Sequence, residues 1–292
     1  MKVLVTGASG QLGFDVMREL AVRNVEAIPA SRRQFDVTDS QQTYNFIVSA
    51  APDAVIHCAA YTAVDEAEDE PQLCRRVNVD GTRAVAQACR DIDAKMLYIS
   101  TDYVFPGTGT TPYEVDDPLG PINVYGQSKL DGELAIRELL KHYFIVRTSW
   151  CFGKNGDNFV KKVLRSSREQ GQLNMLIDQI GSPTSARDLA KLLCEMLLTE
   201  KYGIYHATNE GFCSRAQFAE EILKIVGYPV KINKIYSLEY PTKARRPLNS
   251  RLSKASLDAV GFARLPKWQV ALEYYLMITL CNKTTDTIQQ GR

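Results

Sequence analysis

The first twenty residues constrain the fold more than any other stretch of the chain. A short apolar run, Lys2 to Thr6, is followed at once by glycines spaced G-x-x-G-x-x-G and then by an amphipathic pattern through Leu20. Strand, glycine turn and helix in this order are typical of a dinucleotide-binding unit, because glycines let the backbone approach a pyrophosphate at the positive end of the helix. A tight turn without a ligand is the alternative. The residues predicted to bind the pyrophosphate are Gly7, Ser9, Gly10, Gln11, Leu12 and Gly13.

Strands and helices alternate through residue 148, which predicts an α/β fold with a doubly wound parallel sheet of the Rossmann type. The expected strands after the first are residues 25–29, 54–58, 95–99 and 144–148. Beyond Trp150 the pattern loosens, and a smaller C-terminal α/β domain for substrate binding is expected. We assign residues 1–148 plus about 170–202 to the dinucleotide-binding domain, and about 149–169 plus 203–292 to the smaller one. A strand at 203–206 falls in the second assignment.

The segment after the second strand predicts which dinucleotide is bound. An acidic residue that would grip an NAD ribose is absent there, and Ser31, Arg32 and Arg33 stand in its place. A hydroxyl and guanidinium groups suit a 2′-phosphate, so NADPH is favoured, with NADH tolerated. The alternative is that both arginines face solvent. Asp36 and Val37 are expected near the adenine.

Small residues follow the third strand, where Ala59, Ala60 and Tyr61 are expected to leave room for the cofactor. His57, in that strand, is expected to be a packed residue and not a catalyst. Asn78 has two interpretations: it is structural, or it organises water near the catalytic tyrosine.

Tyr125 and Lys129 form the strongest candidate for acid–base chemistry. A helix over 123–141 places them four residues apart on one face, and the strand before it delivers Thr101 to the same edge of the sheet. A neighbouring cation favours the phenolate, so we expect Lys129 to lower the pKa of Tyr125. Gly126 and Gly132 indicate close approach of another backbone or of a ligand. Tyr-x-x-x-Lys by itself is also a common accident on helices.

Composition excludes several classes of function. With 45% hydrophobic residues, 24% charged residues and a net charge of +1, nothing suggests a nucleic-acid groove or a membrane surface. No signal peptide is recognised, and the seven cysteines are odd in number with no C-x-x-C pair. We therefore expect a cytoplasmic protein with reduced thiols and no metal site. The polar tail from Asn282 to Arg292 is expected to fray.

The chain resembles the extended short-chain dehydrogenase/reductases, and more narrowly the dTDP-4-dehydrorhamnose reductases. The motifs that carry the resemblance lie at residues 7–13, 58–65, 100–105, 125–129, 147–150, 158–159, 178–184 and 246–250. The resemblance implies NADPH-dependent reduction of a C4 ketone on a dTDP-deoxysugar, in the synthesis of dTDP-rhamnose for cell-surface polysaccharide, and a homodimer is a further expectation. It makes Thr101, Tyr125 and Lys129 the catalytic residues. The residues implied to bind substrate are Thr101, Asp102, Tyr103, Trp150, Asn158, Gln179 and Arg246.

Two departures from the family pattern fall in the substrate region. Where the family usually has a Gly-x-x-Ser-Trp run, this chain has Gly211-Phe-Cys-Ser-Arg215, and Arg251 follows Ser250 where a small or acidic residue is common. The cluster of Arg245, Arg246 and Arg251 suits a diphosphate, and a basic surface loop is the alternative.

The sequence bears on three rival functions. A dehydratase needs an Asp-Glu pair after Thr101, and this chain offers Asp102 and then Tyr103. A 4-epimerase would retain NAD and would not prefer a 2′-phosphate. A non-catalytic regulatory subunit similar to the β subunit of methionine adenosyltransferase needs no proton donor.

Overall fold

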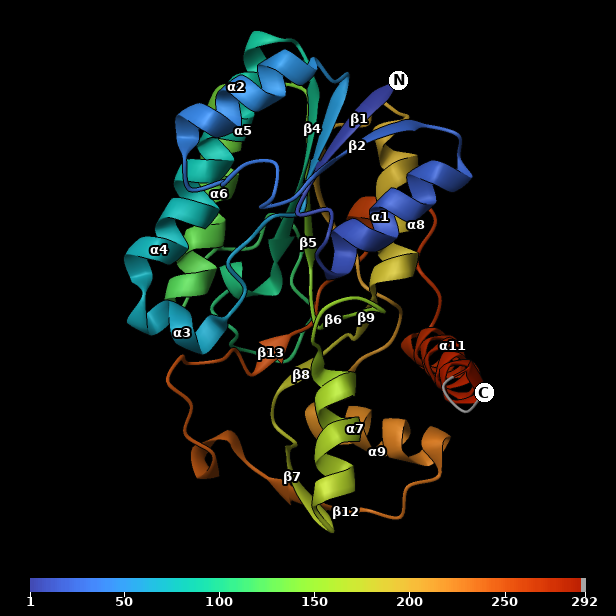
Figure 1. Cartoon of the computed structure of the whole chain (residues 1–292). Helices are drawn as coiled ribbons and strands as arrows, with labels where there is room; N and C mark the ends of the chain where they lie inside the picture. Colours follow the sequence, from blue (N-terminus) through green and yellow to red (C-terminus); the bar gives the residue numbers. More distant parts are fainter. Residues whose placement is uncertain (290–292) are drawn as a thin grey trace.

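A six-stranded parallel sheet forms the centre of the molecule, in the order β10-β5-β4-β3-β1-β2 (Figure 1). The computed structural model describes the backbone of residues 1–289 and the side chains of residues 1–279. The strands are β1 (Lys2–Thr6), β2 (Glu26–Ala30), β3 (Ala54–His57), β4 (Lys95–Thr101), β5 (Tyr143–Thr148) and β10 (Gly203–His206). The central strands carry near-continuous apolar residues because both of their faces are covered. The predicted doubly wound fold is confirmed.

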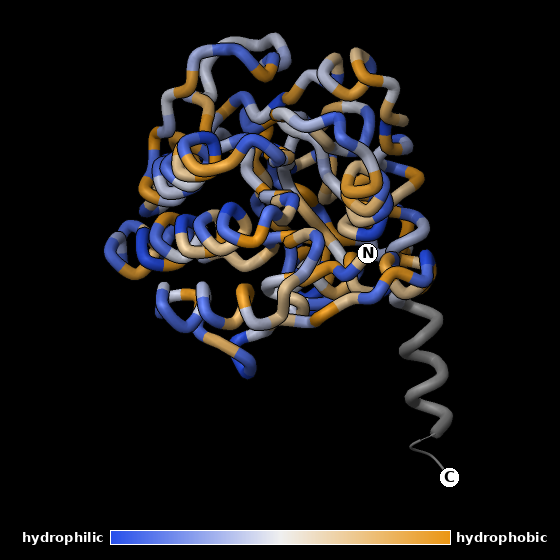
Figure 2. Tube along the Cα trace, turned by 90° about the horizontal axis from the view of Figure 1, so that it is seen from above, coloured by the Kyte–Doolittle hydropathy of each residue, from blue (hydrophilic) through white to orange (hydrophobic). Residues whose placement is uncertain are grey.

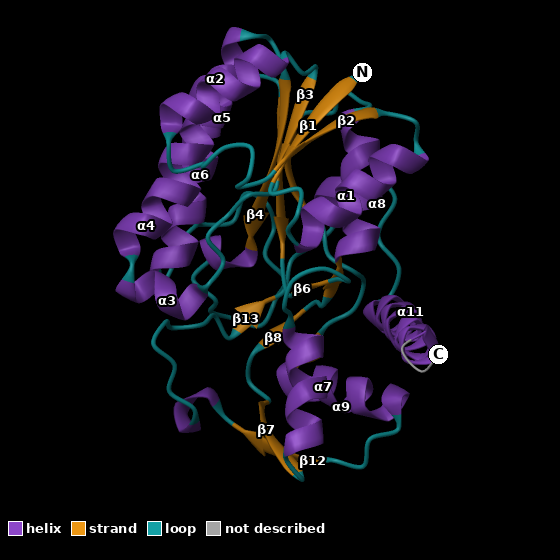
Figure 3. Ribbon diagram, viewed as in Figure 1, coloured by secondary structure: helices purple, strands orange, loops and turns teal. Residues whose placement is uncertain are grey.

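Helices cover the two faces of this sheet (Figure 3). On one side α1 (Gln11–Val22) packs against α8 (Ala186–Leu197), and on the other α5 (Gly81–Asp91) packs between α2 (Ser40–Ala50) and α6 (Val124–Leu139). One hydrophobic core lies beneath each layer. Seen from above, the helices alternate between hydrophilic and hydrophobic residues, as expected of elements with one buried face (Figure 2).

Side-chain caps fix where several helices begin. Asp39 accepts a hydrogen bond from the backbone of α2 and Asn123 from that of α6, while Ser214 forms a capping box at α9 (Arg215–Val226). The cap at Asn123 is functionally important because it starts α6 one residue before Tyr125.

The second region lies beyond the carboxyl ends of the sheet strands (Figure 1). Its core joins α7 (Phe159–Glu169), α9 and the start of α11 (Trp268–Gln289). Two parallel strands, β7 (Gln172–Leu176) and β12 (Lys231–Ile235), form its far edge. Short strands link it to the main sheet: β6 (Cys151–Phe152) with β9 (Thr184–Ser185), and β8 (Ile180–Gly181) with β11 (Cys213–Ser214) and β13 (Asn249–Ser250). A short helix, α10 (Ala255–Asp258), packs near β10.

Two strands lie elsewhere than the sequence analysis placed them. Gly203–His206 is β10, which pairs with β5 and completes the main sheet, although we had assigned it to the smaller domain. Residues 172–176 form β7, which pairs with β12 in the second region and not with the main sheet. Both placements depend on pairing between residues far apart in sequence, which periodicity does not reveal.

The helix expected over 70–90 is divided. It consists of α4 (Pro71–Arg75), a π-helical turn at Arg76–Asp80 and α5, preceded by α3 (Val64–Asp69). The π-helical turn contains Asn78, whose side chain bonds outside the helix. The tail expected to fray lies outside the residues whose side chains are described, and 290–292 lie outside the described backbone. In the part of the chain that the structure describes, no helix is long and apolar enough to cross a membrane.

A buried ion pair joins α6 to the sheet. The Arg147 guanidinium donates to both carboxylate oxygens of Glu133, at 2.9 and 2.8 Å, and each side chain is only 1% exposed. Ser100 on β4 donates to the same carboxylate at 2.5 Å, and Arg147 also donates to the carbonyl of Val115. This network holds α6, β4, β5 and the loop that contains Val115 in one register.

We expect Arg147→Met to lower the free energy of unfolding by about 3–5 kcal/mol, because it leaves the Glu133 carboxylate buried without its partner. Urea denaturation followed by circular dichroism measures the change. The exposed pair of Arg83 and Glu138 is the control, and Arg83→Met should leave the free energy of unfolding almost unchanged. Equal effects of the two substitutions would contradict a stabilising role of the buried pair.

Candidate active site

Three adjoining cavities lie at the carboxyl edge of the sheet. The central cavity, of about 450 Å³, lies between the first glycine turn, the ends of β4 and β5, and α6. The glycine-turn cavity, of about 770 Å³, lies between that turn and the loop after β2. The distal cavity, of about 800 Å³, opens in the second region. Gly10, Cys58 and Ala60 line both of the first two, and Arg215 lines both the central and the distal cavity.

The glycine turn is shaped for close approach. Gly7 has a φ of +63°, and a Cβ there would lie 2.8 Å from the backbone nitrogen of Ala59. No side chain caps the N-terminus of α1 at Gly10, so its backbone N–H groups remain available to an anion. The turn residues Gly7, Ser9, Gly10, Gln11 and Leu12 line the cavities, while Gly13 packs against the carbonyl of Gly7; their contact with a pyrophosphate stays a prediction.

The loop after β2 gives the glycine-turn cavity its basic wall. Ser31, Arg32 and Arg33 all line it, and both arginines are exposed. Within the described residues, neither guanidinium has a carboxylate within 4 Å. Asp36 is placed differently from the prediction. Its carboxylate turns back to accept from the backbone of Thr38 at 2.9 Å, a bond that holds its pKa below the usual range.

Val37, Ala59 and Ala60 line the glycine-turn cavity as predicted, but Tyr61 does not. Its hydroxyl donates to Glu70 at 2.8 Å, away from the cavity. Asn78 exchanges two hydrogen bonds with the Tyr61 backbone and donates to Ser128. Ser128 in turn donates to the carbonyl of Tyr125, so Asn78 is structural, the first of its two interpretations.

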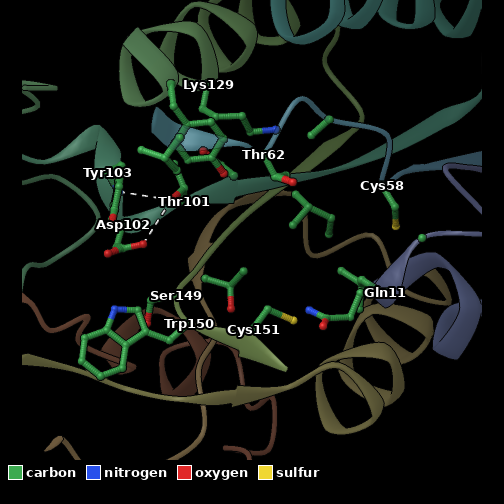
Figure 4. Close-up of a pocket in the computed structure, with 18 of the residues that line it drawn as sticks. Gln11, Cys58, Thr62, Thr101, Asp102, Tyr103, Lys129, Ser149, Trp150 and Cys151 are labelled. Atoms are coloured by element: carbon green, nitrogen blue, oxygen red, sulfur yellow. Dashed lines mark hydrogen bonds between the residues drawn. The ribbon is translucent and has the colours of Figure 1, made fainter. Parts of the chain in front are cut away.

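The structure brings Thr101, Tyr125 and Lys129 to the central cavity (Figure 4). Thr101 ends β4, where its hydroxyl donates to Asp102 at 3.1 Å. The Tyr125 ring meets that of Tyr103 edge to face, with centroids 5.8 Å apart. Gly126 explains the close fit, since a Cβ there would lie 2.3 Å from the Tyr103 carbonyl oxygen. Gly126 therefore leaves room for the backbone of Tyr103, and Gly132 leaves room for the side chain of Tyr98.

Burial sets the protonation of this group. It raises the pKa of Tyr125 well above its usual value, opposed in part by a hydrogen bond with Thr101. Burial also lowers the pKa of Lys129 to about 7, and Glu133 opposes that change. The net shift of the phenol pKa is upward, opposite to the lowering expected from Lys129, because desolvation dominates. Each group is desolvated, and desolvation favours the neutral form of both.

The stacked rings of Tyr98 and His57 pack against Lys129. Its ammonium nitrogen lies 4.0 Å from the ring centroid of Tyr98, and Tyr98 stacks on His57 at 5.8 Å. The His57 ring lies between the hydroxyls of Thr6, at 2.7 Å, and Thr82, at 3.1 Å. His57 is a packed strand residue, and burial lowers its pKa to about 3.

This pKa predicts a pH dependence of stability. The unfolded histidine takes up a proton below about pH 6.5, and the folded one does so only near 3, so stability is lost as pH falls between these values. One such group changes the free energy of unfolding by about 1.4 kcal/mol per pH unit. We expect His57→Gln to reduce this slope in urea titrations from pH 6.5 to 4. The surface residue His142 is the control. Identical slopes in wild type and His57→Gln would contradict the assignment.

The opposite wall of the central cavity carries the other predicted residues. Asp102 is 3% exposed with one carboxylate oxygen unpartnered among the described residues, and burial raises its pKa to about 6. Trp150 adopts a φ of +48°, which turns the chain away from β5. Its ring is covered by the guanidinium of Arg215, 3.6 Å from the ring centroid.

Arg246 lines the distal cavity with Gln179, as predicted, but its guanidinium is already paired. It donates to both oxygens of Asp65, at 2.9 and 2.5 Å. Asn158 lines none of the three cavities. It caps α7 and donates to Gln11 at 3.0 Å, joining that helix to the glycine turn. Arg245 and Arg251 also lie outside the three cavities.

Sequence reasoning missed several residues of these walls. Thr62, Ser149 and Cys151 line the central cavity, and Figure 4 shows them facing the same space as Thr101 and Lys129. Their signal was position alone, since Thr62 and Ser149 lie within motifs and Cys151 directly follows one. Arg215 was noticed as a departure in sequence but not as a cavity residue. Among the described residues, no group of three His, Cys, Asp or Glu side chains is arranged to hold a metal ion.

The geometry agrees with what the chain resembles. The family model described as "RmlD substrate binding domain" matches residues 1–280. A dTDP-4-dehydrorhamnose reductase of Sinorhizobium fredii is 39% identical over 280 residues, covering 92% of this chain and 94% of the relative.

Two solved structures are similar over almost the whole chain. One is a dTDP-4-dehydrorhamnose reductase from Clostridium acetobutylicum, 36% identical with a TM-score of 0.94, covering 96% of this chain and 100% of that one. The other is from Bacillus anthracis in complex with NADP, 39% identical with a TM-score of 0.92, covering 95% and 99%. The resemblance found in the sequence is confirmed, and the chain belongs to the RmlD substrate-binding domain family, that of the dTDP-4-dehydrorhamnose reductases.

Proposed function

We propose that this protein reduces the C4 ketone of dTDP-4-dehydro-6-deoxy-L-mannose with NADPH, giving dTDP-L-rhamnose. The observation that carries the proposal is one cavity lined by Thr101, Tyr125 and Lys129 and joined to a glycine turn with a free helix N-terminus. A phenol, a hydroxyl and an amine there match proton donation to a forming alkoxide. The names of the relatives supply the sugar and the nucleotide.

The chain's own residues fit the cofactor. The turn at Gly7 has no room for a side chain, the N–H groups of α1 face the cavities, and Arg32 offers a cation for a 2′-phosphate. NADPH supplies the hydride for C4 when bound. Lys129, near the glycine turn across the central cavity, can hold a ribose hydroxyl.

Proton delivery follows from burial. Because the pKa of Tyr125 is raised, the phenol is fully protonated at neutral pH and is ready to donate. The resulting phenolate would be costly in this cavity without a nearby positive charge. Lys129, with a pKa of about 7, can carry that charge at the moment of transfer. Thr101 donates a hydrogen bond to the same sugar oxygen.

The free thiols of the six described cysteines suit a reducing compartment, and we place the reaction in the cytoplasm. A homodimer remains a prediction.

We expect Tyr125→Phe to lower kcat by about 10²- to 10⁴-fold, because the variant lacks the proton that the alkoxide needs. NADPH affinity should be unchanged, since the ring is retained. The measurements are NADPH oxidation with the dTDP-ketosugar and a fluorescence titration of NADPH, with Tyr44→Phe on the surface as the control. Near-normal turnover of Tyr125→Phe would refute the role of the phenol. A product other than dTDP-L-rhamnose, identified by NMR, would refute the proposed substrate.

We expect Arg32→Ala to raise KM for NADPH about ten- to a hundredfold and to leave KM for NADH nearly unchanged, because only NADPH carries the 2′-phosphate. Two KM titrations on each enzyme measure this. Arg90→Ala, an exposed arginine paired with Asp91 away from the cavities, is the control. Equal increases for both cofactors would mean that Arg32 does not contact the 2′-phosphate.

A further inference from the structure

Arg215 occupies the junction between the central and the distal cavity. It is the first residue of α9, and its side chain lines both spaces. The guanidinium lies 3.6 Å from the ring centroid of Trp150 and 5.2 Å from that of Phe159. Among the described residues it has no carboxylate within 4 Å and no hydrogen-bond acceptor. A cation is therefore fixed between two aromatic rings with its N–H groups unpaired.

The surroundings of Arg215 disfavour a positive charge. Burial lowers its pKa, and the nearby charge of Arg246 acts in the same direction. The N-terminus of α9 adds a further repulsion, because the helix dipole is positive there. Stacking on Trp150 compensates for part of this cost. An anion bound at the junction would relieve all three effects at once.

Among the residues whose side chains are described, no group supplies that anion. Asp65, the carboxylate of the distal cavity, is engaged by both nitrogens of the Arg246 fork. Asp102 is buried in the wall of the central cavity and lies beyond ion-pair distance of Arg215. Tyr103 and Cys213, the other titratable neighbours, are uncharged at neutral pH because burial raises the pKa of each. The phosphates of the dinucleotide are served by the glycine-turn cavity, which Arg215 does not line.

The position selects the ligand. A sugar that reacts at Tyr125 occupies the central cavity, and the distal cavity offers Phe159, Met175 and Tyr240 to a planar base. The group that connects a sugar to its nucleoside is a diphosphate, which must then pass the junction. We propose that Arg215 binds the diphosphate of the nucleotide sugar there, and that Arg246, neutralised by Asp65, shapes the distal cavity and supplies less of the attraction. The identity of the nucleotide rests on the proposed function.

Calorimetric titration of the full chain tests this inference. The probes are dTDP, thymidine and UDP, and the variants are Arg215→Met and Arg215→Lys. We expect Arg215→Met to weaken dTDP binding about ten- to a hundredfold and to leave thymidine binding unchanged, because only dTDP carries the anion. Arg215→Lys should lose less, since it keeps the charge but not the planar fork. Arg168→Met, an exposed arginine that stacks on Tyr228 and lines no cavity, is the control.

The outcomes separate this inference from the proposed function. Unchanged dTDP affinity in Arg215→Met overturns the inference even where the ketosugar is reduced normally. Loss of UDP affinity in Arg215→Met supports the anion site, even where the wild type does not reduce the dTDP-ketosugar. In that case the proposed substrate is wrong and the inference about Arg215 stands. Failure of the wild type to bind either nucleotide overturns the inference. NADPH titration and the melting temperature show whether each variant is folded, and Arg215→Lys provides the test if Arg215→Met is not.

Discussion

The ion pair of Glu133 and Arg147 fixes the geometry on which the site depends. Glu133 lies one helical turn after Lys129, and Arg147 lies on the strand that leads to Trp150. Replacing such a pair with apolar residues would cost little or nothing in general, since desolvation offsets most of the attraction. What the pair provides is register. Four hydrogen bonds between α6, β4, β5 and the 106–121 loop form together only when α6 lies at one height along the sheet. Tyr125 and Thr101 then reach the same cavity.

Desolvation of Tyr125 and Lys129 sets their protonation states. It raises the pKa of Tyr125 and lowers that of Lys129. A pair with both groups neutral can hold a proton on the phenol until negative charge develops on a substrate. The ring stack of His57 and Tyr98 places a π face against the lysine, which favours its charged form without a carboxylate in contact. A carboxylate in contact with Lys129 would keep it charged and would compete for its bonds.

How far the sequence predicts this molecule depends on how local each feature is. The glycine turn, the strands through residue 148 and the spacing of Tyr125 and Lys129 are local patterns, and the structure contains all of them. Pairing across the chain was not predictable. Asp65 and Arg246 are 181 residues apart, and nothing in either motif indicates that one engages the other. The sequence pattern places β10 in the C-terminal region, because its sheet partner β5 lies far away along the chain. His206, for example, pairs with Arg147, which is 59 residues earlier. The local hydrogen bond from Thr38 to the Asp36 carboxylate was likewise not visible in the sequence.

The charge distribution along the three cavities follows one logic. Each place where a ligand phosphate is expected presents a donor that is unpaired among the described residues: the N–H groups of α1, the guanidinium of Arg32 and that of Arg215. Arg147 and Arg246 do have carboxylate partners; Arg147 is buried in the interior, and Arg246 lines the distal cavity. Where such a donor is partly buried, as Arg215 is, leaving it unpaired costs free energy in the empty protein, and packing against Trp150 offsets part of that cost. That cost is returned when an anion binds, and it makes the cavities selective for ligands that carry phosphate at these positions.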